Sequence, residues 1–184
     1  MSILTRPLTY DDLCLMPNDG HRYEIIDGEL LVSPTPSRNH QKVAARLHLL
    51  LGNLVEANGA GEVYFAPVDV RLTPHDVVQP DLLFIRADRL GIYQARGVVE
   101  GPPDLVVEIL SPANRTVDQV RKAALYARAG VPEYWIVDPD SEELVAQRLV
   151  DGQYEPIMPI NRTVHSGVVP ELTVDVSKLF ADLD

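Results

Sequence analysis

Hydrophobic residues along this chain follow the spacing of strands in some stretches and of helices in others. The run Asp104-Leu105-Val106-Val107-Glu108-Ile109-Leu110-Ser111-Pro112 is apolar apart from its ends and one carboxylate in its middle. A run of this length, rich in β-branched residues and followed by helical spacing, predicts a central strand covered on both faces. Glu108 is out of place there, because a buried carboxylate needs a cation, a metal or an open cleft.

The segment after the central strand predicts one βαβ unit. Helical spacing runs from Thr116 to Ala129, Gly130 ends it, and a second apolar strand follows at 133–139. The two strands are therefore expected to be parallel and joined by a right-handed crossover. The helix positions expected to face the core are Val117, Val120, Ala124 and Ala127.

The N-terminal part of the chain predicts a short helix and then a β-hairpin. The helix spans residues 8–16 and has Thr9 as its N-cap. The hairpin turns at Asp27-Gly28, a preferred pair for a two-residue type I′ turn. This register pairs Glu24 with Leu31 and places Glu24 and Glu29 on one face, opposite an apolar face.

A long helix is predicted from a cap at Ser37 to about Asn58, ended by Gly59 and Gly61. Its core stripe is Val43, Leu47, Leu50, Leu51, Leu54 and Val55. A basic stripe with a spacing of four residues lies beside it and consists of Arg38, Lys42 and Arg46. These three residues form either a solvated helix face or a ridge that contacts phosphates.

The middle and the end of the chain predict further strands. Residues 62–72 alternate, with a bulge or edge at Pro67, and 77–85 form an antiparallel return. Residues 86–103 are expected to be a mobile connection. A hairpin is expected at 143–150 and 153–159, and a short helix at 176–183.

Composition narrows the class of protein. The 184 residues predict one domain, 1–184, and no apolar run approaches the roughly 18 residues that span a bilayer. The lone Cys14 is expected in the core, and the N-terminus has no apolar signal core, which favours a cytoplasmic location without disulfides. The net charge of −11 argues against broad adhesion to nucleic acid, although much of the acidic excess lies in residues 139–184.

Three predicted strands carry an acid where an apolar residue would pack better, at Glu24, Asp81 and Glu108. Carboxylates from neighbouring strands suit a hard cation such as Mg²⁺ or Mn²⁺, which takes oxygen ligands. Two simpler explanations stay open: Pro80-Asp81 is also typical of a turn before a strand, and Glu24 also fits the solvated face of a hairpin.

Lys122 is expected to reach Glu108 from the helix after the central strand. Glu108 lies about 6 to 7 Å below the top of its strand, and Lys122 lies about 9 Å down the returning helix. A helix packs about 10 Å from a sheet, a gap that a lysine stem can largely span. The alternative is a surface pair with Asp118 at i, i+4.

This set of residues favours hydrolysis of phosphodiesters. Metal ions held by two or three carboxylates activate water and stabilise charge on a phosphate, while an ammonium orients the water or neutralises the transition state. The chain has no Gly-rich phosphate loop, Ser-His-Asp array or closely spaced His pair that would predict another enzyme.

Together, several blocks resemble the Uma-type restriction endonuclease family of the PD-(D/E)XK nuclease superfamily, over roughly residues 8–180. The blocks are Arg22-Tyr23-Glu24-Ile25-Ile26-Asp27-Gly28-Glu29-Leu30, Gln79-Pro80-Asp81-Leu82-Leu83-Phe84, Val106-Val107-Glu108-Ile109-Leu110-Ser111-Pro112, Lys122 with Tyr126-Ala127-Arg128-Ala129-Gly130-Val131, and Glu133-Tyr134-Trp135-Ile136-Val137-Asp138-Pro139.

The resemblance implies an α/β fold with a restriction-endonuclease-like core: a mixed central sheet, an N-terminal β-hairpin, a long helix and one βαβ unit. It also implies Mg²⁺-dependent cleavage of nucleic acid, with Asp81 as the PD acid and Glu108 as the (D/E) acid. The motif lysine belongs where this chain has Leu110, so Lys122 would supply the ammonium. Glu24 would be the first acid with Glu29 as its competitor, and His40 either faces the cleft or has a capping or surface role.

Three classes of function follow. The leading hypothesis is a metal-dependent DNA endonuclease that hydrolyses phosphodiester bonds and acts as a homodimer, because cutting both strands of a duplex suits two sites related by a two-fold axis. The second is a nuclease-fold module that binds nucleic acid or a protein partner without cutting it. The third is a structural domain whose acids are solvated.

Overall fold

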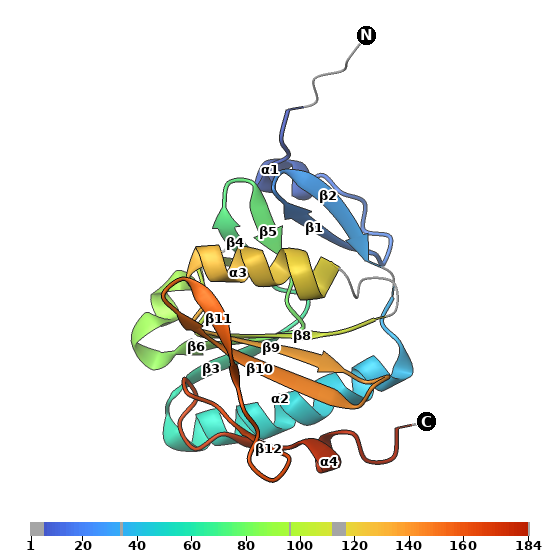
Figure 1. Ribbon diagram of the computed structural model, residues 1–184. Helices are drawn as coiled ribbons and strands as arrows, with labels where there is room; N and C mark the ends of the chain where they lie inside the picture. The colour runs from blue at the N-terminus through green and yellow to red at the C-terminus, as the bar shows by residue number, and fades with distance from the viewer. Residues whose placement is uncertain (1–5, 34, 96, 112–116, 184) are drawn as a thin grey trace.

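A computed structural model describes residues 6–33, 35–95, 97–111 and 117–183, without the side chains of 117–119. It contains two large mixed sheets and several helices (Figure 1). The first sheet has the strand order β2-β1-β5-β4-β7. Its strands are β1 (Arg22–Ile26), β2 (Glu29–Ser33), β4 (Asp69–Thr73), β5 (Asp76–Val78) and β7 (Val98–Glu100).

The second sheet has the order β11-β10-β9-β8-β6-β3 and forms the centre of the molecule. Its strands are β3 (Gly61–Phe65), β6 (Leu82–Arg86), β8 (Leu105–Ile109), β9 (Glu133–Asp138), β10 (Glu143–Val150) and β11 (Gln153–Ile157). A two-stranded sheet, β12 (Thr163–His165) with β13 (Thr173–Asp175), lies near the C-terminus and was not expected from the sequence. The mixed α/β class is therefore confirmed. The N-terminal hairpin, β1 with β2, belongs to the first sheet, called the hairpin sheet below, and not to the central sheet.

Two helices cover the two faces of the six-stranded sheet. The α-helices are α1 (Tyr10–Leu13), α2 (Arg38–Asn58), α3 (Ala123–Ala129) and α4 (Val176–Leu179), with the 3-10 helix η1 (Ala87–Ile92) and the π-helical turn η2 (Val117–Lys122). Figure 1 shows α2 beneath this sheet and α3 above it, next to the hairpin sheet. One apolar core lies between α2 and the sheet, and the other between the sheet, α3 and the hairpin sheet. Among the described residues, no helix combines the length and apolar character that a membrane crossing requires.

The N-terminal hairpin forms in the predicted register. Glu24 pairs with Leu31, and the turn residues Asp27 and Gly28 have φ values of 55° and 75°. The expectation of a single apolar face is wrong, because both faces of β1 are covered: Ile25 packs against α1 and Ile26 enters the core shared with α3. Glu24 therefore lies in the interior rather than in solvent.

The strand predicted at 62–72 is divided between the two sheets. The break falls at the cis peptide bond Ala66-Pro67, after which β4 joins the hairpin sheet. The returning segment breaks at the corresponding point, between β5 and β6, where Asp81 lies. The backbone N–H of Ala66 donates to the carbonyl of Asp81 at 3.1 Å and links the two breaks.

The βαβ unit is present, but the buried face of its helix was predicted wrongly. Strands β8 and β9 are parallel, with Glu108 opposite Ile136. Val120 is 63% exposed, and the residues that face the interior are Lys122, Leu125 and Tyr126. A π-helical turn has more residues per turn than an α-helix, so it shifts the face that follows it. Residues 112–116, where the helix was expected to begin, lie outside the described residues.

Four smaller predictions also differ from the structure. Cys14 and Leu50 are exposed rather than in the core. The segment 86–103 contains η1 and β7, and the C-terminal helix ends at Leu179. The cap at Ser37, the left-handed Gly59 after α2 and the hairpin of β10 and β11 are confirmed.

Candidate active site

Glu108 lies on the face of β8 that points to α3, and Asp81 comes directly before the neighbouring strand β6. Leu82 pairs with Val107, so one step outward Asp81 lies opposite Glu108. The backbone N–H of Ile109 donates to Asp81 Oδ2 at 2.7 Å and fixes this carboxylate on the neighbouring strand. The pairing of β6 with β8, which the sequence analysis did not specify, therefore brings these two acids together.

Lys122 lies between two acids that come from different sheets. Its Nζ is 2.9 Å from Glu24 Oε1 and 3.0 Å from Glu108 Oε1. All three residues are buried, with at most 2% of each exposed to solvent. The helix thus carries its ammonium to the predicted position, and Glu24 is placed across from Glu108. The side chain of Asp118, the alternative partner, is outside the described part of the chain.

Further hydrogen bonds hold the two glutamates in place. The hydroxyl of Tyr126 donates to Glu108 Oε1 at 2.6 Å. Burial and the negative charges of Glu108 and Glu24 raise the pKa of Tyr126 well above its usual value, so the phenol stays a donor. The backbone N–H of Gln79 donates to Glu24 Oε1 at 2.8 Å.

Asp81 is bound by two further side chains. Arg22 donates to Oδ1 at 2.8 Å, and the Nε2 of His40 is 3.2 Å from Oδ2. Burial alone would raise the pKa of Asp81, but the hydrogen bond from His40 and the charge of Arg22 hold it below the usual value. Burial would lower the pKa of Arg22, but the charges of Asp81, Glu108 and Glu24 raise it above its usual value.

A cavity of about 410 Å³ opens beside Asp81. Arg22, His40 and Asp81 line it, together with Phe65 at the end of β3. Glu24, Glu108 and Lys122 do not line the cavity, since they lie buried beneath the surface. The Arg22–Asp81–His40 group therefore borders solvent, and the Glu24–Lys122–Glu108 group lies in the interior.

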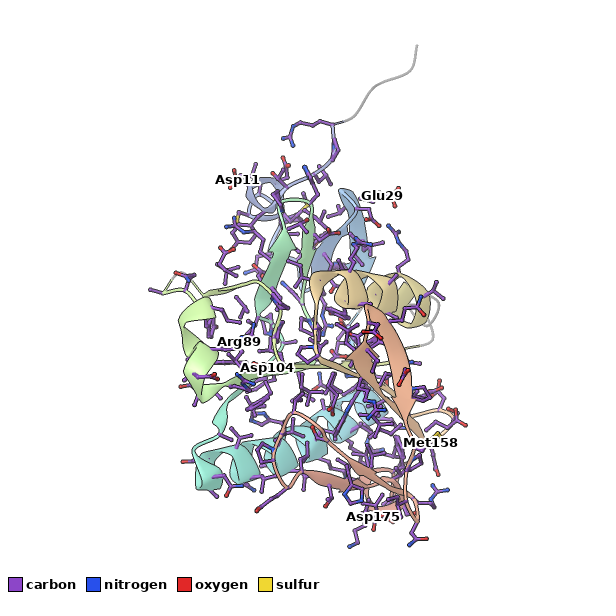
Figure 2. All side chains as sticks on the ribbon, turned by 60° about the vertical axis from the view of Figure 1, so that its left-hand side comes forward. Asp11, Glu29, Arg89, Asp104, Met158 and Asp175 are labelled. Atoms are coloured by element: carbon purple, nitrogen blue, oxygen red, sulfur yellow. The ribbon has the colours of Figure 1, made fainter. Side chains whose placement is uncertain are left out.

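Four candidate residues lie outside this cluster. The exposed side chain of Glu29 contacts Arg121 at 3.0 Å, and Figure 2 shows it at the outer end of the hairpin. In the basic stripe, Lys42 donates to the carbonyl of Asp182, and Arg46 donates to carbonyls of Leu179 and Ala181. Arg38 begins α2. At least two residues of the stripe thus hold the C-terminal segment.

The chemistry of the acids fits a hard divalent cation. Glu24 and Glu108 direct oxygen atoms at one positive group, and the carboxylate of Asp81 is bound to the backbone N–H of Ile109, next to Glu108. In the described residues, however, no three Asp, Glu, His or Cys side chains are spaced to hold a metal ion. A metal ion would therefore compete with Lys122 and Arg22 for the carboxylate oxygens.

Two residues of the cluster were not singled out from the sequence. Arg22 is two residues before Glu24, which places both on one face of a strand. Tyr126 is four residues after Lys122, which places both on one face of a helix. Both spacings can be read from the sequence, but they identify Arg22 and Tyr126 as site residues only when these faces are known to be buried.

Comparisons with known proteins agree with this fold. The family model "Uma2: Putative restriction endonuclease" matches residues 8–177. Among solved structures, the chain is similar to the "Crystal structure of a putative nuclease belonging to DUF820 from Anabaena variabilis". The TM-score is 0.78 at 20% sequence identity, over 95% of this chain and 98% of that chain, which establishes a shared fold. A search of the curated proteins found no match.

Proposed function

The chain belongs to the Uma2 family, and from this membership and the geometry of the site we propose that it is a metal-dependent endonuclease that hydrolyses phosphodiester bonds in DNA. The family description supports a nuclease of the restriction-endonuclease-like kind. The observation that carries the proposal is the contact of Lys122 with both Glu24 and Glu108, next to Asp81. Acids that could hold a metal ion, next to an ammonium, can supply the water activation and the charge stabilisation of phosphodiester hydrolysis.

Mg²⁺ or Mn²⁺ is the proposed cofactor, held by Asp81 and Glu108 with Glu24. When bound, such an ion lowers the pKa of a coordinated water and stabilises negative charge on a phosphate. Lys122 and Arg22 contact the same carboxylates, so an ion held there would share these oxygens with the two cations.

The remaining residues have separate tasks in this proposal. Lys122 would hold the attacking water or a phosphate oxygen through its ammonium. Tyr126 keeps Glu108 in place through its hydroxyl. Arg22 and His40 orient Asp81, and Arg22 brings a positive charge to the cavity through which the phosphate approaches.

A second candidate is a nuclease-fold module that binds nucleic acid or a protein partner without cutting it. The ion pairs of Lys122 and Arg22 favour this candidate, because they neutralise the acids without any metal ion. The net charge of −11 works against affinity for the DNA backbone, so within this candidate it favours a protein partner over nucleic acid. We propose in either case that DNA is the nucleic acid and that two copies associate.

Cleavage of supercoiled plasmid in Mg²⁺ or Mn²⁺, compared with EDTA, tests the endonuclease proposal. We expect nicking by the wild type with either metal ion, none in EDTA, and none by Asp81→Ala, whose folding is checked by circular dichroism. A folded wild type that leaves the plasmid intact with both ions would refute the proposal. Retained binding of DNA in that case would select the second candidate.

A further inference from the structure

Phe65 is an exposed aromatic residue at the mouth of the proposed active site. It is the last residue of β3 and pairs with Leu82, the residue that follows Asp81. Its side chain is 58% exposed although it is large and apolar, and it lines the same cavity as Arg22 and His40. Single exposed apolar residues are common, but here the position beside a polar cavity and a cluster of acids gives the ring a ligand to contact.

The ring of Phe65 packs against a second aromatic ring. The ring of His48 packs edge-on against it, with centroids 4.6 Å apart and an interplanar angle of 67°. His48 lies on the same stripe of α2 as His40, eight residues later. One face of α2 thus supports both the aromatic ring and the side chain that contacts Asp81.

Aromatic and polar groups in the cavity match the two parts of a nucleotide. Phe65 offers a surface for stacking a base, which is how proteins bind unpaired bases whatever their identity. Arg22 offers a guanidinium for the phosphate. Nδ1 of the buried His40 has no hydrogen-bond partner among the described residues. The cavity of about 410 Å³ is in the size range of small-ligand sites.

From these contacts we infer that the cavity receives one unpaired nucleotide of the substrate strand, with its base stacked on Phe65 and its phosphate at Arg22. The inference rests on the proposed function, because it names the substrate class of the same site: single strands, or duplexes with unpaired nucleotides. The charge of the molecule supports this inference. The net charge is −11, and Lys42 and Arg46 are bound to the C-terminal segment, so there is little attraction for a phosphate backbone. Affinity would then come from contact with an unpaired base.

Oligonucleotide binding in EDTA, where no metal-dependent cleavage occurs, tests this inference. The probes are a fluorescent single strand that contains 2-aminopurine and the blunt duplex of the same sequence. We expect at least tenfold tighter binding of the single strand, with quenched 2-aminopurine fluorescence. Phe65→Leu should lose about tenfold in single-strand affinity, roughly the effect of one stacked base, and Phe65→Tyr should keep the affinity.

Met158→Ala is the matched control, because Met158 is 74% exposed and does not line the cavity (Figure 2). Thermal unfolding verifies that every variant is folded. The inference would be overturned if the single strand and the duplex bound with equal affinity, in EDTA and again in Ca²⁺. It would also be overturned if Phe65→Leu bound the single strand as tightly as the wild type. Plasmid cleavage without single-strand preference would refute only the nucleotide site, whereas single-strand preference without any cleavage would refute only the endonuclease proposal.

Discussion

Lys122 and Leu110 explain how this chain can use a nuclease fold without a lysine at the usual position. Leu110 is 3% exposed and belongs to the apolar core between the sheet and α3, so a charge there would be buried among hydrocarbon. Lys122 reaches the same acid from the following helix and also contacts Glu24. One ammonium thereby compensates two buried carboxylates, each of which would be costly alone.

Replacing this ammonium should destabilise the protein strongly. We expect Lys122→Met to lower the free energy of unfolding by about 3 to 5 kcal/mol in EDTA, because Glu24 and Glu108 lose their buried counter-charge. Urea titration followed by circular dichroism measures the change. Lys178→Met is the control, since Lys178 is 86% exposed and should change the stability very little. Equal midpoints for the two variants would show that the ammonium does not compensate the acids.

Asp81 should make the stability depend on acid pH. Its pKa in the folded state lies below the unfolded value of about 3.9, so its contribution is complete above that value and disappears as pH falls through the folded pKa. The melting temperature of the wild type should therefore fall more steeply than that of Asp81→Asn below about pH 4. If the melting temperatures of the two proteins fell equally with pH over this range, the ion pair of Asp81 with Arg22 would be contradicted.

The individual acids and the contact of Lys122 with Glu108 could be predicted from the sequence, but the partners of Asp81 could not. Glu24, Asp81 and Glu108 stand out because each interrupts an apolar pattern, and one-dimensional spacing gives no comparable signal for a contact between Arg22 and Asp81, which are far apart in sequence. His40 shows the same limit. Its position in the first turn of a helix was predicted, whereas its contact with Asp81 depends on how α2 meets the sheet.

At the scale of elements, the junction between α2 and β3 positions the strand that ends at Phe65. Gly61 begins β3 with a φ of 154°, and a Cβ there would lie 2.1 Å from the carbonyl oxygen of Ile85. Only a glycine allows β3 to approach β6 this closely. Strand β3 then reaches its pairing with Leu82, next to Asp81.

Two glycine substitutions should have opposite effects. We expect Gly61→Ala to lower the free energy of unfolding by about 1 to 3 kcal/mol, because the backbone of β6 must move. Gly52→Ala, inside α2 with no atom within 4 Å of the added Cβ, should raise it by roughly 0.5 to 1 kcal/mol. Chemical denaturation of both variants measures the free energy of unfolding. An unchanged value for Gly61→Ala would contradict the close approach of β3 to β6.

The sequence predicts elements better than it predicts how they are distributed among sheets. The hairpin turn at Asp27-Gly28 and the caps of α2 are local signals, and both appear in the structure. The apolar positions in 62–72 change from odd to even numbers at Pro67, which predicts a bulge or an edge there but not that β3 and β4 enter different sheets. The spacing of apolar residues likewise gives no sign of the π-helical turn before α3, and for this reason the buried face of the helix was predicted wrongly.

At the scale of the whole molecule, ion pairs connect the helix that carries Lys122 to the hairpin that carries Glu24. Arg128 contacts Asp27 at 2.6 Å and Asp76 at 3.1 Å, and Arg121 contacts Glu29. These contacts hold α3 between the two sheets, where Figure 1 shows it. The site therefore exists only in the complete fold, because its acids come from both sheets.

Two copies of the chain are expected to associate, since cleavage of both strands of a duplex is served by two sites related by a two-fold axis. Gel filtration with light scattering at micromolar concentration should give the mass of two chains. A mass of one chain at this concentration would contradict the dimer.

The most direct test of the central claim is the rate of plasmid cleavage by Lys122→Met in saturating Mg²⁺, at a temperature where circular dichroism shows the variant to be folded. We expect a loss of at least about a hundredfold relative to the wild type, the size of effect that one electrostatic group in an active site provides. Lys178→Met should cleave at the wild-type rate. Wild-type cleavage by folded Lys122→Met would contradict the account, because the lysine between Glu24 and Glu108 would then have no part in the reaction.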